Sequence, residues 1–170
     1  MDNKVVYATA KVLAGEGLHV LRFNFRGAGG SEGAHDRGRG EQDDARAALD
    51  AAAGLAGPPA AGALLAAGFS FGSYVGLSAA LGDPRVAALL AIAPPVNDYD
   101  FSAIARAEQP LGVILAEQDE LVPAADVEAF IARCRRPPWV ARVPGAGHLF
   151  HARLAPLRAA VAEFARTLRA

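Results

Sequence analysis

The stretch that decides the fold is Gly68-Phe69-Ser70-Phe71-Gly72, which follows the apolar run 63–67 and precedes the helix-like run 74–81. A strand, a sharp turn and a helix with serine at the tip form the G-x-S-x-G arrangement called a nucleophile elbow. The turn forces the serine into a strained backbone conformation, and side chains two residues before and after it would collide across the turn. Ser70 is therefore the candidate nucleophile.

An elbow of this kind predicts that an acidic residue and then a histidine follow, each at the end of a later strand. Two later apolar runs end in such residues: the first leads into Gln118-Asp119-Glu120 and the second into Gly145-Ala146-Gly147-His148. In a parallel sheet the carboxyl ends of the strands meet at one edge. Asp119 and His148 are therefore expected beside Ser70.

These three side chains suit nucleophilic catalysis on a carbonyl. A serine hydroxyl needs a base to take its proton, and His148 fits because an imidazole titrates near neutral pH and can return the proton to the leaving group. Asp119 would orient the imidazole and stabilise its cation. The backbone N–H of Phe71, at the start of the next helix, would supply one oxyanion donor, which is half of an oxyanion hole.

The sequence leaves an alternative to each assignment open. The serine would also suit an ordinary helix N-cap. Glu117 and Glu120 compete with Asp119, because acidic residues in loops are commonly only solvated. His151, which we expect on the final helix, competes with His148, although the loop position after a glycine favours His148. The two remaining histidines, His19 and His35, are expected at the surface or in loops.

Apolar runs that alternate with amphipathic segments predict an α/β fold with a mostly parallel sheet of about five strands and helices on both faces. A loop over 26–38 and an irregular stretch over 94–109 complete the chain. The expected strands are 19–25, 61–69, 87–93, 111–117 and 139–143, and the expected helices are 4–14, 41–53, 71–82, 124–134 and 150–168.

Length and composition narrow the class of protein. The 170 residues, 52% of them hydrophobic, favour a single domain over 1–170. A net charge of -1 gives no electrostatic reason to expect nucleic acid or an anionic membrane as partner. The one cysteine, Cys134, excludes an intrachain disulfide and a cysteine cluster for zinc. The start Met1-Asp2-Asn3-Lys4 lacks an apolar leader and no apolar run approaches a membrane span, so we expect a cytoplasmic protein.

The glycine-rich stretch Arg26-Gly27-Ala28-Gly29-Gly30-Ser31-Glu32-Gly33 does not favour a nucleotide site. It does not match G-x-G-x-x-G, and the next helix begins only after several charged residues, so no helix N-terminus directly faces a phosphate there. A P-loop would need Gly-Lys-Ser or Gly-Lys-Thr, and the sequence contains neither.

Taken together, these motifs resemble the small, nearly lidless bacterial α/β-hydrolases, which are often described as dienelactone-hydrolase-like. The resemblance covers essentially the whole chain and implies the triad Ser70, Asp119 and His148 with no cofactor and no metal. It rests on the elbow and on the segments Phe23-Asn24-Phe25-Arg26-Gly27-Ala28-Gly29-Gly30-Ser31-Glu32-Gly33, Ala93-Pro94-Pro95-Val96, Gln118-Asp119-Glu120 and Gly145-Ala146-Gly147-His148-Leu149-Phe150-His151.

One departure from that family matters. Its members begin with further strands and a His-Pro-rich loop ending in Gly-Gly, placed before the helix that starts here at Met1. That loop normally gives the second oxyanion donor, and its strand lies in the middle of the sheet. The chain reads as an N-terminally truncated form, so we expect the strands ending at Phe25 and Phe69 to pair directly, because an unfilled gap would leave backbone groups unpaired.

The sequence therefore predicts a serine hydrolase for small esters or thioesters that works through an acyl-enzyme intermediate. The stretch 94–109 is too short for a large cap domain, so we expect a shallow, open pocket. The alternative is a catalytically impaired hydrolase-fold protein that serves as a binding or interaction module. In either case an exposed sheet edge would favour self-association.

Overall fold

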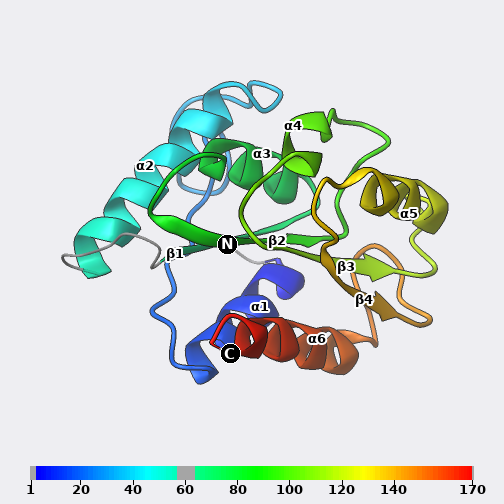
Figure 1. The fold of residues 1–170 in the computed structure, drawn as a ribbon. Helices are drawn as coiled ribbons and strands as arrows, with labels where there is room; N and C mark the ends of the chain where they lie inside the picture. Colours follow the sequence, from blue (N-terminus) through cyan, green and yellow to red (C-terminus); the bar gives the residue numbers. More distant parts are fainter. Residues whose placement is uncertain (1–2, 57–63, 170) are drawn as a thin grey trace.

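A parallel sheet of four strands forms the centre of the part of the chain that the computed structural model describes, residues 3–56 and 64–169 (Figure 1). The strands lie in the order β1-β2-β3-β4, and each pairs in parallel with the next. Their bounds are β1 Leu64–Phe69, β2 Val86–Ile92, β3 Leu111–Ala116 and β4 Trp139–Val143.

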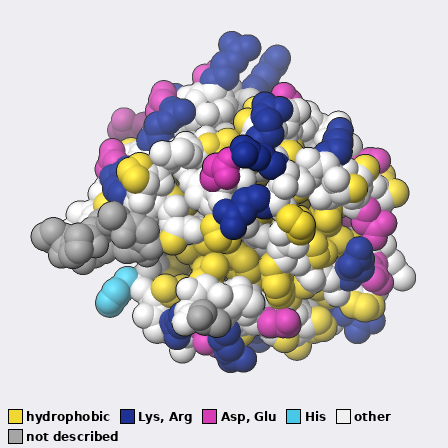
Figure 2. All heavy atoms as spheres, viewed as in Figure 1, with side chains coloured by type: hydrophobic (Ala, Val, Ile, Leu, Met, Phe, Trp, Pro, Cys, Tyr) yellow, Lys and Arg dark blue, Asp and Glu magenta, His cyan; other side chains and the backbone are white. Residues whose placement is uncertain are grey.

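Helices cover both faces of the sheet (Figure 1). One face carries α1 Lys4–Gly15 and α6 Leu154–Thr167. The other face carries α2 Gly40–Ala56, α3 Phe71–Ala80, α4 Ser102–Ala105 and α5 Ala124–Arg133. None of these helices is long and apolar enough to span a bilayer. Apolar side chains reach the surface along the level of the sheet, between charged side chains above and below (Figure 2).

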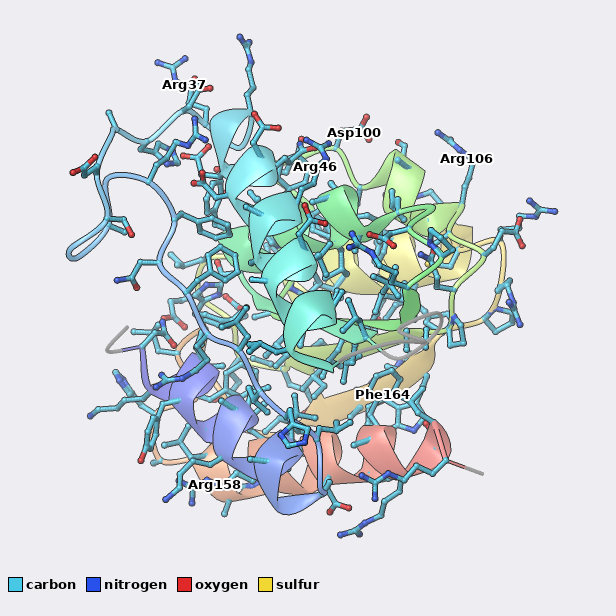
Figure 3. All side chains as sticks on the ribbon, turned by 90° about the vertical axis from the view of Figure 1, so that its left-hand side faces the viewer. Arg37, Arg46, Asp100, Arg106, Arg158 and Phe164 are labelled. Carbon is cyan, nitrogen blue, oxygen red and sulfur yellow. The ribbon has the colours of Figure 1, made fainter. Side chains whose placement is uncertain are left out.

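Alternating side chains of the inner strands feed two hydrophobic cores, as expected for strands buried on both faces. Leu90 and Ile114 pack on the side of α1 and α6, whereas Leu89 and Val113 pack on the side of α3, α4 and α5. All four side chains are fully buried. Phe164 points from α6 toward the sheet (Figure 3), where a Cβ on Gly112 would come within 2.7 Å of its ring.

The fold class expected from the sequence is confirmed, and most elements fall within a few residues of their expected bounds. The final helix begins at Leu154 rather than at residue 150, and the stretch 94–109 contains the short α4. Residues 61–63 of the expected strand 61–69 lie outside the described residues.

The expected strand over 19–25 is wrong, and the described sheet has four strands rather than about five. Residues 18–25 are extended, but no backbone hydrogen bond joins them to β1 among the described residues. The expected direct pairing is absent because a space of about 460 Å³, which we call the β1 groove, separates this segment from β1. The groove is open, since Ala67 of β1 is exposed, so water reaches the edge that we expected to be sealed.

The loop between the extended segment and α2 is organised around a buried carboxylate. Glu41, in the first turn of α2, is fully buried and accepts hydrogen bonds from the backbone N–H groups of Asp36 and Gly38 at 2.7 and 2.8 Å. Burial acts to raise the pKa of Glu41, but these donors and the nearby His35 together hold the pKa below its usual range. A charged Glu41 therefore fixes the loop against the start of α2.

Candidate active site

Ser70 lies at the tip of a sharp turn between β1 and α3, at the carboxyl edge of the sheet. Its backbone has φ 49° and ψ -127°, a conformation that non-glycine residues rarely adopt. The Ser70 N–H donates to the carbonyl of Ile92 at the end of β2, at 2.9 Å. The Ser73 hydroxyl donates to the Ser70 carbonyl at 2.6 Å. These bonds hold the strained residue between the strand and the helix.

The two glycines of the elbow are not equally constrained. A Cβ on Gly68 would come within 2.3 Å of the Gly72 carbonyl oxygen, so only glycine fits at position 68. A Cβ on Gly72 would meet only the Phe25 ring at 3.9 Å, which is ordinary contact. The expectation that both positions exclude a side chain is therefore correct for Gly68 and wrong for Gly72. The Cβ vector at position 72 points away from the crossing point of the turn.

Ser70, His148 and Asp119 form one chain of hydrogen-bonding distances. His148 Nε2 lies 2.9 Å from the Ser70 hydroxyl, and His148 Nδ1 lies 2.8 Å from Asp119 Oδ2. The side chains of His148 and Asp119 are only 5% and 3% exposed. Sequence order thus led to three residues that the structure brings together from the ends of β1, β3 and β4.

The contacts of Asp119 define the tautomer of the histidine. Asp119 Oδ1 accepts from the backbone N–H groups of Leu121 and Val122, both at 2.9 Å, which leaves Oδ2 for the imidazole. A carboxylate so placed accepts a hydrogen bond from Nδ1–H, and Nε2 is then the free acceptor that faces the serine hydroxyl. This is the arrangement that a base for Ser70 requires.

The two acidic residues that compete with Asp119 are both exposed and occupy different positions in the loop. Glu117 is exposed at the end of β3 and Glu120 is exposed beyond it. Glu120 Oε2 nevertheless accepts the backbone N–H of His148 at 3.0 Å, and this bond is the main reason that the pKa of Glu120 is lowered. Gly147 permits the contact, because a Cβ there would come within 2.6 Å of Glu120 Oε2. Glu120 holds the main chain of the histidine, and Asp119 holds its ring.

The hydrogen-bonding distances to Ser70 and Asp119 involve His148 and not the competing His151. His151 lies in an exposed turn before α6 rather than on that helix, so our expectation for its element is wrong. The helix starts late because Phe150 and Ala152 adopt φ values of 51° and 58°, which a helix cannot continue through.

Aromatic contacts near Ser70 were not expected from the sequence. His35, taken as a surface or loop residue, lies in the loop that Glu41 organises, and its ring centroid is 5.2 Å from that of Phe71. Its Nδ1 lies 2.8 Å from Glu41 Oε1. Phe71 also contacts Phe25 and Tyr99, at 5.8 and 5.7 Å between centroids. The loop and the stretch after β2 therefore meet over the residue that follows the serine.

The described residues contain no group of three or more His, Cys, Asp or Glu side chains arranged to hold a metal ion. At the edge of the sheet, the side chains of Ser70, His148 and Asp119 lie within hydrogen-bonding distance of one another. Such a site is suited to proton transfer between a hydroxyl, an imidazole and a carboxylate.

Comparison with known proteins places this fold in a class. The structure is similar to an alpha-beta serine hydrolase homologue from Coxiella burnetii, with a TM-score of 0.89 and 38% identity over 96% of this chain and 77% of that chain. It is also similar to an α/β serine hydrolase without lid from Xanthomonas campestris, with a TM-score of 0.87 and 38% identity over 98% of this chain and 74% of that one.

Sequence comparison gives the family. Residues 1–122 match the family described as X-Pro dipeptidyl-peptidase (S15 family). The chain belongs to the α/β serine hydrolases, in the family that this S15 description covers. It is also 43% identical over 136 residues to an uncharacterized protein of Rickettsia prowazekii, with 78% of this chain matched. The chain spans about half of that relative's length, 56%.

Proposed function

We propose that this protein is a serine hydrolase that cleaves small ester or thioester substrates through Ser70, His148 and Asp119. The observation that carries the proposal is the continuous chain of contacts from the Ser70 hydroxyl through the buried His148 ring to the Asp119 carboxylate, at 2.9 and 2.8 Å. Membership of a serine hydrolase family supports the same reading.

The proposed reaction has two balanced halves. His148 Nε2 takes the hydroxyl proton as Ser70 Oγ bonds to the substrate carbonyl carbon, and the imidazolium then gives that proton to the departing alkoxide or thiolate. In the second half His148 takes a proton from the water that attacks the acyl carbon, and the imidazolium then gives this proton to Ser70 Oγ as the bond from the acyl carbon to Oγ breaks and the acid is released. Asp119 stays ionised throughout and stabilises the imidazolium.

The negative oxygen that develops on the substrate needs N–H donors. The backbone N–H of Phe71, at the first position of α3, is placed beside Ser70 and would also benefit from the positive end of the helix. A single donor leaves the oxyanion hole half complete, which typically costs about 3 kcal/mol, or about a hundredfold in rate. We therefore expect measurable but modest hydrolysis.

The second candidate function is a catalytically impaired binding or interaction module. The observation that favours it is the open β1 groove directly beside the elbow, because a serine site next to an incomplete sheet edge has less support than one in a closed sheet. A hydrolase requires a nucleophilic serine, whereas a binding module does not.

A fluorophosphonate probe tests the proposal, because it reacts covalently with an activated serine. We expect labelling of the protein and slow p-nitrophenyl acetate hydrolysis, both lost in Ser70→Ala, with Ser78→Ala, at a half-buried serine further along α3, as the control. Absence of labelling in a folded protein would favour the binding module. Cleavage of an X-Pro p-nitroanilide in preference to the ester would instead assign peptide substrates.

A further inference from the structure

The loops that carry Asp119 and His148 are joined at two points besides the contact between their side chains. The backbone N–H of Gln118 donates to the Ala146 carbonyl at 2.9 Å. The backbone N–H of His148 donates to Glu120 Oε2 at 3.0 Å. Along the loop after β3, the residue that contacts the imidazole therefore lies between two residues that bind the main chain of the loop after β4.

The second of these bonds involves more than a solvated carboxylate. Glu120 is exposed, and exposed carboxylates commonly contribute little. Its oxygen, however, accepts the N–H of His148, a residue that is only 4% exposed. The backbone N–H groups of His148 and of Glu120 itself are the main reasons that the pKa of this carboxyl is lowered. A buried N–H that loses its acceptor is costly, so the main chain at His148 depends on this side chain.

The residue before the histidine leaves space for the carboxylate. A Cβ on Gly147 would come within 2.6 Å of Glu120 Oε2, whereas the Gln118 carbonyl oxygen would lie at 3.7 Å, which is ordinary contact. The φ of Gly147 is not positive, so the backbone conformation does not require glycine there. The missing side chain at position 147 therefore serves the contact between Glu120 and His148.

The contact with Asp119 alone does not fix where the imidazole points. A ring held at Nδ1 can still pivot about that atom, and such a pivot moves Nε2 relative to the Ser70 hydroxyl, which lies 2.9 Å away. A misplacement of about 1 Å between reacting groups can cost about a hundredfold in rate. A second constraint on the histidine, at its main chain, removes this freedom.

We infer that Glu120 is a positioning residue for His148, holding the histidine main chain so that Nε2 stays within reach of the Ser70 hydroxyl. The role needs a side-chain oxygen that accepts the backbone N–H, and it needs no contact with substrate. The kinetic part of the inference rests on the proposed function, whereas the contact itself can be measured without substrate.

Two substitutions remove the contact from opposite ends. Glu120→Ala deletes the acceptor, and Gly147→Ala displaces it, since only the flexible end of the Glu120 side chain would have to move. Each should lower kcat for p-nitrophenyl acetate by about tenfold to a hundredfold with little change in KM. Glu120→Gln keeps an acceptor oxygen and should recover most of the loss. Glu117→Ala is the control for an exposed carboxylate in the same loop.

The double variant Glu120→Ala/Gly147→Ala tests whether the two changes act on one bond. If they do, the double variant should be no slower than the slower single variant, because the carboxylate that the new Cβ would displace is already gone. Independent effects would multiply. Circular dichroism of each variant shows that the fold is retained.

NMR separates the inference from the proposed function. The proton signals of the His148 backbone N–H and of its Nδ1–H report the two contacts with no substrate present. We expect both signals to move in Glu120→Ala and Gly147→Ala, to return toward their original positions in Glu120→Gln, and to stay in place in Glu117→Ala. If the unsubstituted protein showed these shifts but neither fluorophosphonate labelling nor ester hydrolysis, the proposed function would fail and the positioning of His148 would stand.

Three outcomes would overturn the inference. One is an unchanged kcat with unchanged His148 signals in Glu120→Ala. Another is a loss in Glu120→Gln as large as in Glu120→Ala, which would assign the role to the charge and not to the acceptor. The third is a multiplied loss in the double variant, which would mean that Gly147 acts through a different contact.

Discussion

The two halves of the candidate site are held in different ways. Asp119 and His148 lie in loops after β3 and β4, and each is fixed by backbone hydrogen bonds within a few residues of the strand ends. Ser70 follows β1, a half-exposed strand that borders an open groove. Asp119 and His148 are thus positioned by local polar contacts, whereas Ser70 depends on its turn and on one edge of β2. Experiments that disturb one half at a time test this difference.

The largest effect is expected from the acid and base. Asp119→Asn and His148→Ala should each lower kcat/KM for p-nitrophenyl acetate by about ten-thousand-fold, because the imidazole loses its orientation or is absent. Glu117→Gln and His151→Ala are matched controls in the same loops and should change the rate by no more than about twofold. An equal loss of activity in His151→Ala would contradict the assignment of His148 as the base.

The elbow glycines provide the next largest contrast. Gly68→Ala should destabilise the fold by several kcal/mol or displace Ser70, since its Cβ would overlap the Gly72 carbonyl at 2.3 Å. Gly72→Ala should leave the free energy of unfolding within about 1 kcal/mol, because its Cβ has room and alanine favours a helix. Urea unfolding of both variants measures the difference. Equal destabilisation would mean that the turn is not what holds the serine.

Core truncations compare the closed and open parts of the sheet. Leu90→Ala in β2 should cost about 2 to 5 kcal/mol of unfolding free energy, because Leu90 is fully buried. Leu65→Ala in β1 should cost about 1 kcal/mol, because Leu65 is only half-buried and borders the groove. Similar losses at both positions would show that β1 is packed as tightly as β2.

The pH dependence of the loop beside Ser70 is the subtlest test. The folded-state pKa of Glu41 is lowered, so its contribution is present above the ordinary glutamate pKa and is lost as pH falls through the folded value. Glu41→Gln should therefore cost about 1 to 3 kcal/mol at pH 7 and progressively less below about pH 4.5. Thermal unfolding of both proteins from pH 7 to pH 3 measures this. A constant difference across that range would contradict a charged Glu41.

Much of the fold was predictable because its signals are local. β2 and β3 are continuous apolar runs bounded by turn residues, and these runs are buried on both faces. Residues 19–25 carry a similar apolar signal but form no strand, since a strand also needs a hydrogen-bonded neighbour. No pattern within the segment reports whether that neighbour exists, and this is why our strand count was too high.

The candidate site was predictable in part for the same reason. The order of Ser70, Asp119 and His148 follows from strand ends, which sequence patterns locate. The tolerance at Gly72 and the contact of His35 with Phe71 depend on the path of the chain in three dimensions. Glu41 gave no signal beyond a carboxylate at a helix start, because burial of a charge depends on which backbone donors the loop brings to it.

The adjacent positions of Asp119 and Glu120 have a mechanical consequence. Asp119 contacts the ring of His148 and Glu120 accepts its backbone N–H, so two neighbouring residues of one turn fix the position of the imidazole. Any shift of that turn would carry the histidine with it as one body. Such a shift would change the 2.9 Å contact between His148 and Ser70 and leave the contacts of Asp119 and Glu120 with His148 intact.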